Sequence, residues 1–69
     1  MAVYRVELRS SRRELRHEDR VIFNLKNDAE LAAVLAAMAK SAGVKPNGHK
    51  IRVIDTSGRR WKTVREVAG

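Results

Sequence analysis

The chain contains no cysteine, and this absence excludes a disulfide framework and a thiolate metal site. Its two histidines, His17 and His49, stand alone without metal-ligand spacing, so we expect neither a metal nor another cofactor. One proline and four glycines form no low-complexity tract or interdomain linker. We therefore expect residues 1–69 to fold as one small domain with a limited core of its own.

Long hydrophobic runs are also missing. No apolar stretch approaches the ~18 residues that a membrane-spanning helix needs. The first residues, MAVYRVELRSSRR, lack the contiguous apolar segment of a secretory signal. These absences predict a soluble, cytoplasmic protein with no membrane partner.

Signatures of catalysis are equally scarce. The chain has no glycine-rich phosphate loop, and no pattern places a nucleophile beside a base. Asn47-Gly48 and Ser57-Gly58 are turn dipeptides, and Asp55 is typical of the residue that begins a turn. Zinc-finger ligands and the aromatic motif of RRM domains are absent as well. We expect no enzyme and no small-molecule substrate.

Acidic residues are few compared with basic ones. Eight Asp and Glu stand against fifteen Lys and Arg, which gives a formal net charge of +7. The imbalance is greatest in residues 49–69, where six bases accompany two acids. Such a field attracts polyanions. The apolar fraction of 43% is normal for a folded protein, so a disordered basic tail is not expected.

Two segments in the first part of the chain alternate apolar and polar residues, as half-buried strands do. Residues 2–9 form the first, and residues 20–26 form the second. A polar loop between them favours antiparallel pairing. The apolar faces that we expect consist of Tyr4, Val6 and Leu8 in the first strand, and Val21, Phe23 and Leu25 in the second.

Residues 10–19 allow two interpretations. Ser11 and Glu14 have the spacing of a capping box, so a short helical turn could start there. Alternatively, the segment is the far end of a long twisted hairpin in which Leu15 continues the inward side of the strand.

The central segment predicts a helix. Asn27 is a suitable N-cap with Glu30 as its capping-box partner, and Asp28 suits the positive end of the helix dipole. Gly43 is placed for a left-handed C-cap, and Lys45-Pro46-Asn47-Gly48 then forms a turn. The apolar stripe has helical spacing and consists of Leu31, Val34, Leu35, Met38 and Ala42.

The last part of the chain predicts a second hairpin. Residues 49–54 and 59–67 are the strands, and residues 55–58 suit a type I turn with a bulge and a left-handed Gly58. The element order is therefore β-β-α-β-β. We expect an α+β fold in which one helix packs on one face of an antiparallel four-stranded sheet.

The basic residues of this hairpin are the candidate nucleic-acid site. An outward-facing basic strand can follow a phosphate backbone, and Arg makes bidentate phosphate contacts. The alternative is a solvated outer face that keeps a small domain soluble. The candidate contacts are Arg52, Arg59, Arg60 and Lys62, with Lys50 and Arg65 at the edge.

Two further features bear on this site. Trp61 could stack on an exposed base, but the chain has only three aromatic residues, so we expect Trp61 in the core. The bases of the N-terminal loop alternate with acids, which favours local salt bridges over ligand contact. These bases are Arg12, Arg13, Arg16 and Arg20.

The helix lacks polar residues from Leu31 to Ala39. Its second side is made of small residues that allow close backbone approach, which suggests a homodimer seam. The alternative is that alanine is simply the best helix former. The candidate interface consists of Ala32, Ala33, Ala36 and Ala37.

Taken together, these patterns favour a small basic protein that binds DNA or RNA, or a nucleoprotein accessory domain. The alternative is a protein-binding accessory protein, such as those of phages or other mobile elements. It would dock an acidic or apolar partner through the alanine side of the helix or a sheet edge. A third hypothesis is a structural subunit of a larger assembly.

Overall fold

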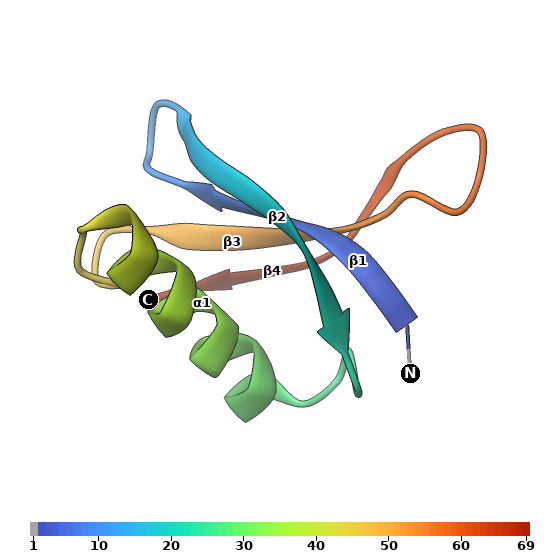
Figure 1. Ribbon diagram of the computed structural model, residues 1–69, viewed down its shortest axis with the longest axis horizontal. Coiled ribbons are helices and arrows are strands. Elements are labelled where there is room, and N and C mark those ends of the chain that lie inside the picture. Colours follow the sequence, from blue (N-terminus) through green and yellow to red (C-terminus); the bar gives the residue numbers. More distant parts are fainter. Residues whose placement is uncertain (1) are drawn as a thin grey trace.

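Four strands and one helix follow one another in the order β1-β2-α1-β3-β4 (Figure 1). The computed structural model describes residues 2–69. The strands form one antiparallel sheet in the order β2-β1-β3-β4, and α1 lies against one of its faces. The α+β class expected from the sequence is confirmed. The bounds are β1 Ala2–Arg9, β2 Glu14–Ile22, α1 Asp28–Ala42, β3 Lys50–Asp55 and β4 Lys62–Ala68.

The core lies between α1 and the two central strands. Side chains alternate between the faces of a strand, so every second residue of β1 and of β3 points toward the helix. The helix contributes the predicted apolar stripe, whose Ala42 is only partly buried. The buried cluster consists of Val6, Leu8, Ile22, Leu31, Val34, Leu35, Met38, Ile51 and Val53.

The ends of α1 are fixed by local hydrogen bonds. The Asn27 side chain accepts a hydrogen bond from the Glu30 backbone N–H at 3.2 Å, as expected of an N-cap. The Glu30 carboxylate accepts hydrogen bonds from the N–H groups of Phe23 at 2.7 Å and Asn24 at 2.9 Å. Glu30 therefore fixes the chain that enters the helix. Gly43 ends the helix in the left-handed conformation, with φ of 73°.

The second strand differs from its expected position. Of the two interpretations of residues 10–19, the long hairpin is confirmed, because β2 begins at Glu14 and only residues 10–13 form the turn. Leu15 packs against the core. The register shifts between Leu8 and Arg9, where Arg9 pairs with Glu14.

The expected bounds of the second strand, residues 20–26, are wrong beyond Ile22, because the chain leaves the sheet there. The pairing aligns Val21 with Val3, on the face away from the helix, and turns Ile22 inward. Val21 is 42% exposed and Phe23 is 73% exposed, whereas Ile22 is 2% exposed. Of the expected apolar face, only Leu25 packs against the core, from the loop before α1.

The C-terminal hairpin also differs from expectation. β4 begins at Lys62 and not at residue 59, because the sheet pairs Asp55 with Lys62 and leaves residues 56–61 as a wide loop. The Asp55 side chain accepts the Ser57 N–H at 2.9 Å, which bends the chain out of β3. Among the described residues only Gly43 and Gly48 have positive φ, so the expected left-handed Gly58 is wrong.

A second irregularity lies within this hairpin. The register shifts between Val53 and Ile54, which pair with Arg65 and Thr63. Val64 is the extra residue, and the bulge turns Arg65 and Thr63 toward opposite faces of the sheet. Strict alternation along β4 would place these two side chains on one face.

Within the described part of the chain, no helix combines the length and the apolar character required to cross a membrane.

Candidate nucleic-acid interface

The face of the sheet turned away from α1 carries many charged side chains. The residues between the core positions of β1 and β3 point to this face, and strand pairing adds residues from both edge strands. We call this surface the open face. Its charged residues are four bases and four acids, so its formal charge is zero: Arg5, Arg9, Lys50 and Arg52 with Glu7, Glu14, Asp19 and Glu66.

Two of the candidate phosphate contacts on the open face share one acid. The Arg52 Nε atom donates a hydrogen bond to a Glu66 carboxylate oxygen at 2.7 Å. The Lys50 Nζ atom lies 3.6 Å from the other oxygen. The hydrogen bond from Arg52, aided by the charge of Lys50, holds the pKa of Glu66 below its ordinary value. Arg52 and Lys50 are therefore partly neutralised in place.

The middle of the open face is neutralised in the same way. Arg5 lies 3.5 Å from Glu7 and 3.7 Å from Glu14, measured between nitrogen and carboxylate oxygen. Arg9 lies 3.8 Å from Glu7. A polyanion lying flat on these strands would meet paired charges.

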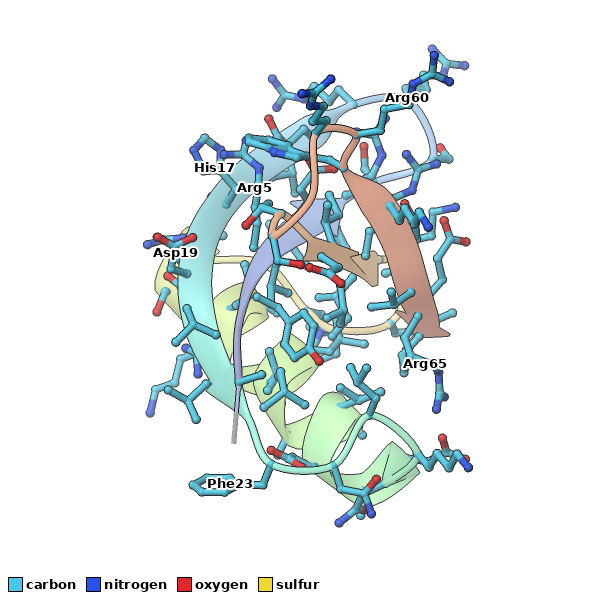
Figure 2. All side chains as sticks on the ribbon, turned by 90° about the vertical axis from the view of Figure 1, so that its right-hand side faces the viewer. Arg5, His17, Asp19, Phe23, Arg60 and Arg65 are labelled. Atoms are coloured by element: carbon cyan, nitrogen blue, oxygen red, sulfur yellow. The ribbon has the colours of Figure 1, made fainter. Side chains whose placement is uncertain are left out.

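Arg65 lies on the other side of the sheet. Its guanidinium donates hydrogen bonds to the Leu25 carbonyl oxygen at 2.7 Å and to the Asp28 carboxylate at 2.6 Å. Figure 2 shows Arg65 near the start of the helix, well below Arg60, which lies at the top of the view. Arg65 thus ties β4 to the N-terminal end of α1 and is separated from the other candidate contacts.

The remaining candidates, Arg59, Arg60 and Lys62, lie in and just after the loop between β3 and β4. All three side chains are exposed, and none of them forms an ion pair within residues 2–69. The same holds for Arg12 and Arg13 in the turn between β1 and β2. We call these two segments, residues 10–13 and residues 56–62, the basic turns.

The basic turns project in the same direction. In Figure 1 both rise on the side of the sheet away from α1, one at each end of the molecule's long axis. Figure 2 shows the same arrangement, with both turns at the top and the helix at the bottom. The open face forms the surface between them, so the structure places unpaired positive charge at both ends of a neutral surface.

The other bases of the N-terminal loop form the local salt bridges expected from the sequence. Arg20 Nε lies 2.6 Å from one Glu18 oxygen, and an Arg16 terminal nitrogen lies 3.1 Å from the other. The hydrogen bond from Arg20 is the main reason why the pKa of Glu18 lies below its ordinary value. Arg16 and Arg20 are thus ion-paired residues of β2, whereas Arg12 and Arg13 are the unpaired bases of the β1–β2 turn.

Trp61 is not a core residue, and the expectation that placed it there is wrong. Its side chain is 59% exposed, because the wide loop before β4 carries it beyond the paired part of the hairpin. Its ring lies over Arg5, with 5.3 Å between the Arg5 Cζ atom and the ring centroid, a cation–π contact. No pattern in the sequence indicated Arg5, since only the sheet brings the two residues together.

The four alanines proposed as an interface lie along α1. Ala32, Ala33 and Ala36 are exposed, and Ala37 is half-buried. They form a small-residue surface on the helix, separate from the basic turns. A homodimer through this surface stays a prediction.

A hollow of about 270 Å³ lies where the β1–β2 turn meets the turn before β3. Arg9, Ser10, His49 and Lys50 are among its lining residues. Arg9 and Lys50 are already paired with Glu7 and Glu66, so the hollow offers no unpaired cation of its own. No cluster of three or more potential metal ligands occurs among the residues that the structure describes.

The fold and its surface define a small α+β domain with two basic turns. No protein-family model, no curated protein and no solved structure matches the chain. Since unrelated functions share folds of this class, the functional argument depends on the side chains described above.

Proposed function

We propose that this protein binds nucleic acid, DNA or RNA, through phosphate contacts made by its basic turns. Arg59, Arg60 and Lys62 are the principal contacts, and Arg12 and Arg13 act at the other end of the open face. One observation carries the proposal. Within residues 2–69, seven of the fifteen basic residues form ion pairs, and five of the other eight lie on these two turns.

The chemistry of these residues favours a role in phosphate binding over a general role in keeping the protein soluble. Four of the five are arginines, whose planar guanidinium can donate two parallel hydrogen bonds to a phosphate. Lysine would serve solubility equally well. Within residues 2–69 none of the four arginines forms an ion pair, so no acid has to be displaced before they can bind. Lys62 lies opposite Asp55 in the sheet, and, after the hydrogen bonds from Ser57, the Lys62 charge contributes to the lowered pKa of that carboxyl.

The six phosphate contacts that the sequence suggested therefore fall into three groups. Arg59, Arg60 and Lys62 keep their proposed role. Arg52 and Lys50 can contribute only when a phosphate competes with Glu66. Arg65 serves the contact between β4 and α1, so we leave it out of the proposed interface.

Fluorescence anisotropy of labelled random-sequence oligonucleotides, single-stranded and duplex, tests the proposal over a range of salt concentrations. The Arg59→Gln/Arg60→Gln double variant should weaken binding. On duplex DNA each lost phosphate contact should also reduce the log–log salt slope by about 0.9. A suitable control is Lys26→Gln/Lys40→Gln, which removes the same charge from two exposed, unpaired lysines near the ends of α1.

The two double variants separate a site from a general charge effect. Equal losses of affinity in both would mean that only net charge matters, and the assignment to the basic turns would be wrong. No change in anisotropy at low salt with micromolar protein would remove the nucleic-acid function altogether. Circular dichroism of each variant verifies that the fold is retained.

A second candidate function is docking of an acidic protein partner. The observation in its favour is a set of exposed apolar side chains at one end of the β1–β2 pair, where Val3 is 62%, Val21 42% and Phe23 73% exposed. The net charge of +7 suits a partner of opposite sign. Under this function, Phe23→Ser would abolish binding to the partner while the arginine variants would alter mainly its association rate.

A further inference from the structure

Trp61 is the sole tryptophan of the chain, and it combines a cation–π contact with an exposed surface. One side of its ring lies over the Arg5 guanidinium, with the Cζ atom 5.3 Å from the ring centroid. Trp61 is nevertheless 59% exposed, so much of the ring surface is accessible to a ligand. Trp61 also follows Arg59 and Arg60 directly in the sequence.

Arg5, which lies against the ring, has two acidic neighbours of its own. It belongs to β1, a central strand of the sheet, and its guanidinium lies 3.5 Å from Glu7 and 3.7 Å from Glu14. A cation–π contact on such an anchored arginine orients the indole before any ligand arrives. A platform that is already oriented loses little conformational entropy when a flat ligand stacks on it.

We infer that Trp61 is a stacking platform for an unpaired base, and that the ligand of the basic turns is therefore a single-stranded nucleic acid. This inference rests on the proposed function. Bases inside a duplex are already stacked on their neighbours, whereas an unpaired base offers a free face to an aromatic side chain. Arg59 and Arg60 then contact phosphates beside the stacked nucleotide.

The position of Trp61 distinguishes it from the other exposed aromatic residue. Phe23 projects from the end of β2 at the helix side of the molecule, whereas Arg5 and Arg60 lie at the opposite end of the same view (Figure 2). Phe23 is even more exposed, at 73%, but it has no unpaired arginine next to it in the chain. Phe23 therefore serves as a matched control for the loss of an exposed aromatic ring.

The experiment titrates the protein with a short oligothymidylate and follows the emission of Trp61, which reports on this site alone because no other tryptophan is present. Anisotropy of the labelled oligothymidylate and of a labelled duplex of the same length is recorded in parallel. We expect saturable quenching that follows the anisotropy curve of the single strand. Trp61→Ala should weaken single-strand binding by roughly 5- to 150-fold, the range for loss of one stacked base.

Three variants complete the test. Trp61→Phe should retain most of the affinity, because a phenyl ring can also stack. Phe23→Ala should leave single-strand binding unchanged, and the affinity for the duplex should change little in Trp61→Ala. Trp61→Tyr provides a second aromatic replacement if Trp61→Ala proves unstable by circular dichroism.

The possible failures are distinguishable. If anisotropy rises while the emission of Trp61 in the parent protein stays constant and Trp61→Ala binds with the parent affinity, stacking is wrong and phosphate binding by the basic turns stands. If the duplex binds as tightly as the single strand and responds equally to Trp61→Ala, the single-strand assignment is wrong. If neither oligonucleotide binds at low salt, the proposed function and this inference both fail.

Discussion

Arg52 and Glu66 face each other across β3 and β4, and the Arg52 Nε atom donates a hydrogen bond of 2.7 Å to the Glu66 carboxylate. Lys50 approaches the same carboxylate at 3.6 Å. One acid thus pairs with two bases on the open face, and it lies on β4, the strand that follows the wide loop of residues 56–61. This relationship determines how much positive charge the sheet itself presents.

Replacing Glu66 should therefore strengthen nucleic-acid binding. Glu66→Gln leaves Arg52 and Lys50 without an acidic partner, so that one or both can contact phosphate. On duplex DNA the log–log salt slope should steepen by about 0.9 for each phosphate gained. The measurement is anisotropy across a salt series. Asp19→Asn is the control, because it also removes one negative charge from the open face but frees no ion-paired base. Equal steepening in both variants would show that only net charge is at work.

Acid should destabilise the protein partly through Glu18. Hydrogen bonds from Arg20 and Arg16 hold the pKa of Glu18 below its ordinary value. A carboxyl whose pKa is lower in the folded state stabilises the fold above its unfolded pKa, and this stabilisation disappears as the pH falls through the folded pKa. Urea unfolding at neutral pH and at about pH 3 measures the loss. Glu18→Gln should lose less stability over this interval than the parent protein. An identical loss would mean that Glu18 has the same pKa in both states.

Two neighbouring residues at the end of β2 should respond in opposite ways to truncation. Ile22 is 2% exposed and belongs to the core, so Ile22→Ala should lower the free energy of unfolding by about 2–5 kcal/mol. Phe23 is 73% exposed, so Phe23→Ala should change it by no more than about 0.5 kcal/mol. Urea denaturation of both variants checks this. A large loss for Phe23→Ala would indicate that the ring is buried in solution, for instance by a second copy of the chain.

The same pair of residues shows what the sequence can and cannot predict here. The helix was predictable because its signals are local, with Asn27 at one end and Gly43 at the other. The inward face of β1 was predictable because apolar and polar residues alternate strictly along this strand. The face of β2 was not, since Val21, Ile22 and Phe23 are apolar in succession. Only the pairing with β1 decides which of them turns inward.

The candidate site was predictable in its charges but not in their arrangement. Composition indicated the basic C-terminal segment, and Arg59 and Arg60 are indeed exposed and unpaired. Because of the bulge at Val64 and the start of β4 at Lys62, the Arg65 side chain lies on the face of the sheet that α1 covers. These features depend on non-local pairing, as does the contact between Arg5 and Trp61.

The two glycines that were expected to adopt left-handed conformations provide a last comparison. Gly43 has φ of 73° at the end of α1, whereas Gly58 is outside the positive-φ region. A side chain at Gly43 would meet no atom within 4 Å, so any cost of Gly43→Ala comes from the backbone conformation alone. That cost should be about 1–2 kcal/mol in the free energy of unfolding.

Gly58→Ala should be close to neutral, within about 0.5 kcal/mol. A Cβ atom there would lie 3.8 Å from the Arg60 carbonyl oxygen, which is ordinary van der Waals contact. Thermal and urea unfolding of both variants provide the comparison. A tight type I turn with a left-handed Gly58 would instead make Gly58→Ala as costly as Gly43→Ala. Equal destabilisation would therefore argue against the wide loop that exposes Trp61 and carries Arg59 and Arg60, and with it against the arrangement on which the proposed interface depends.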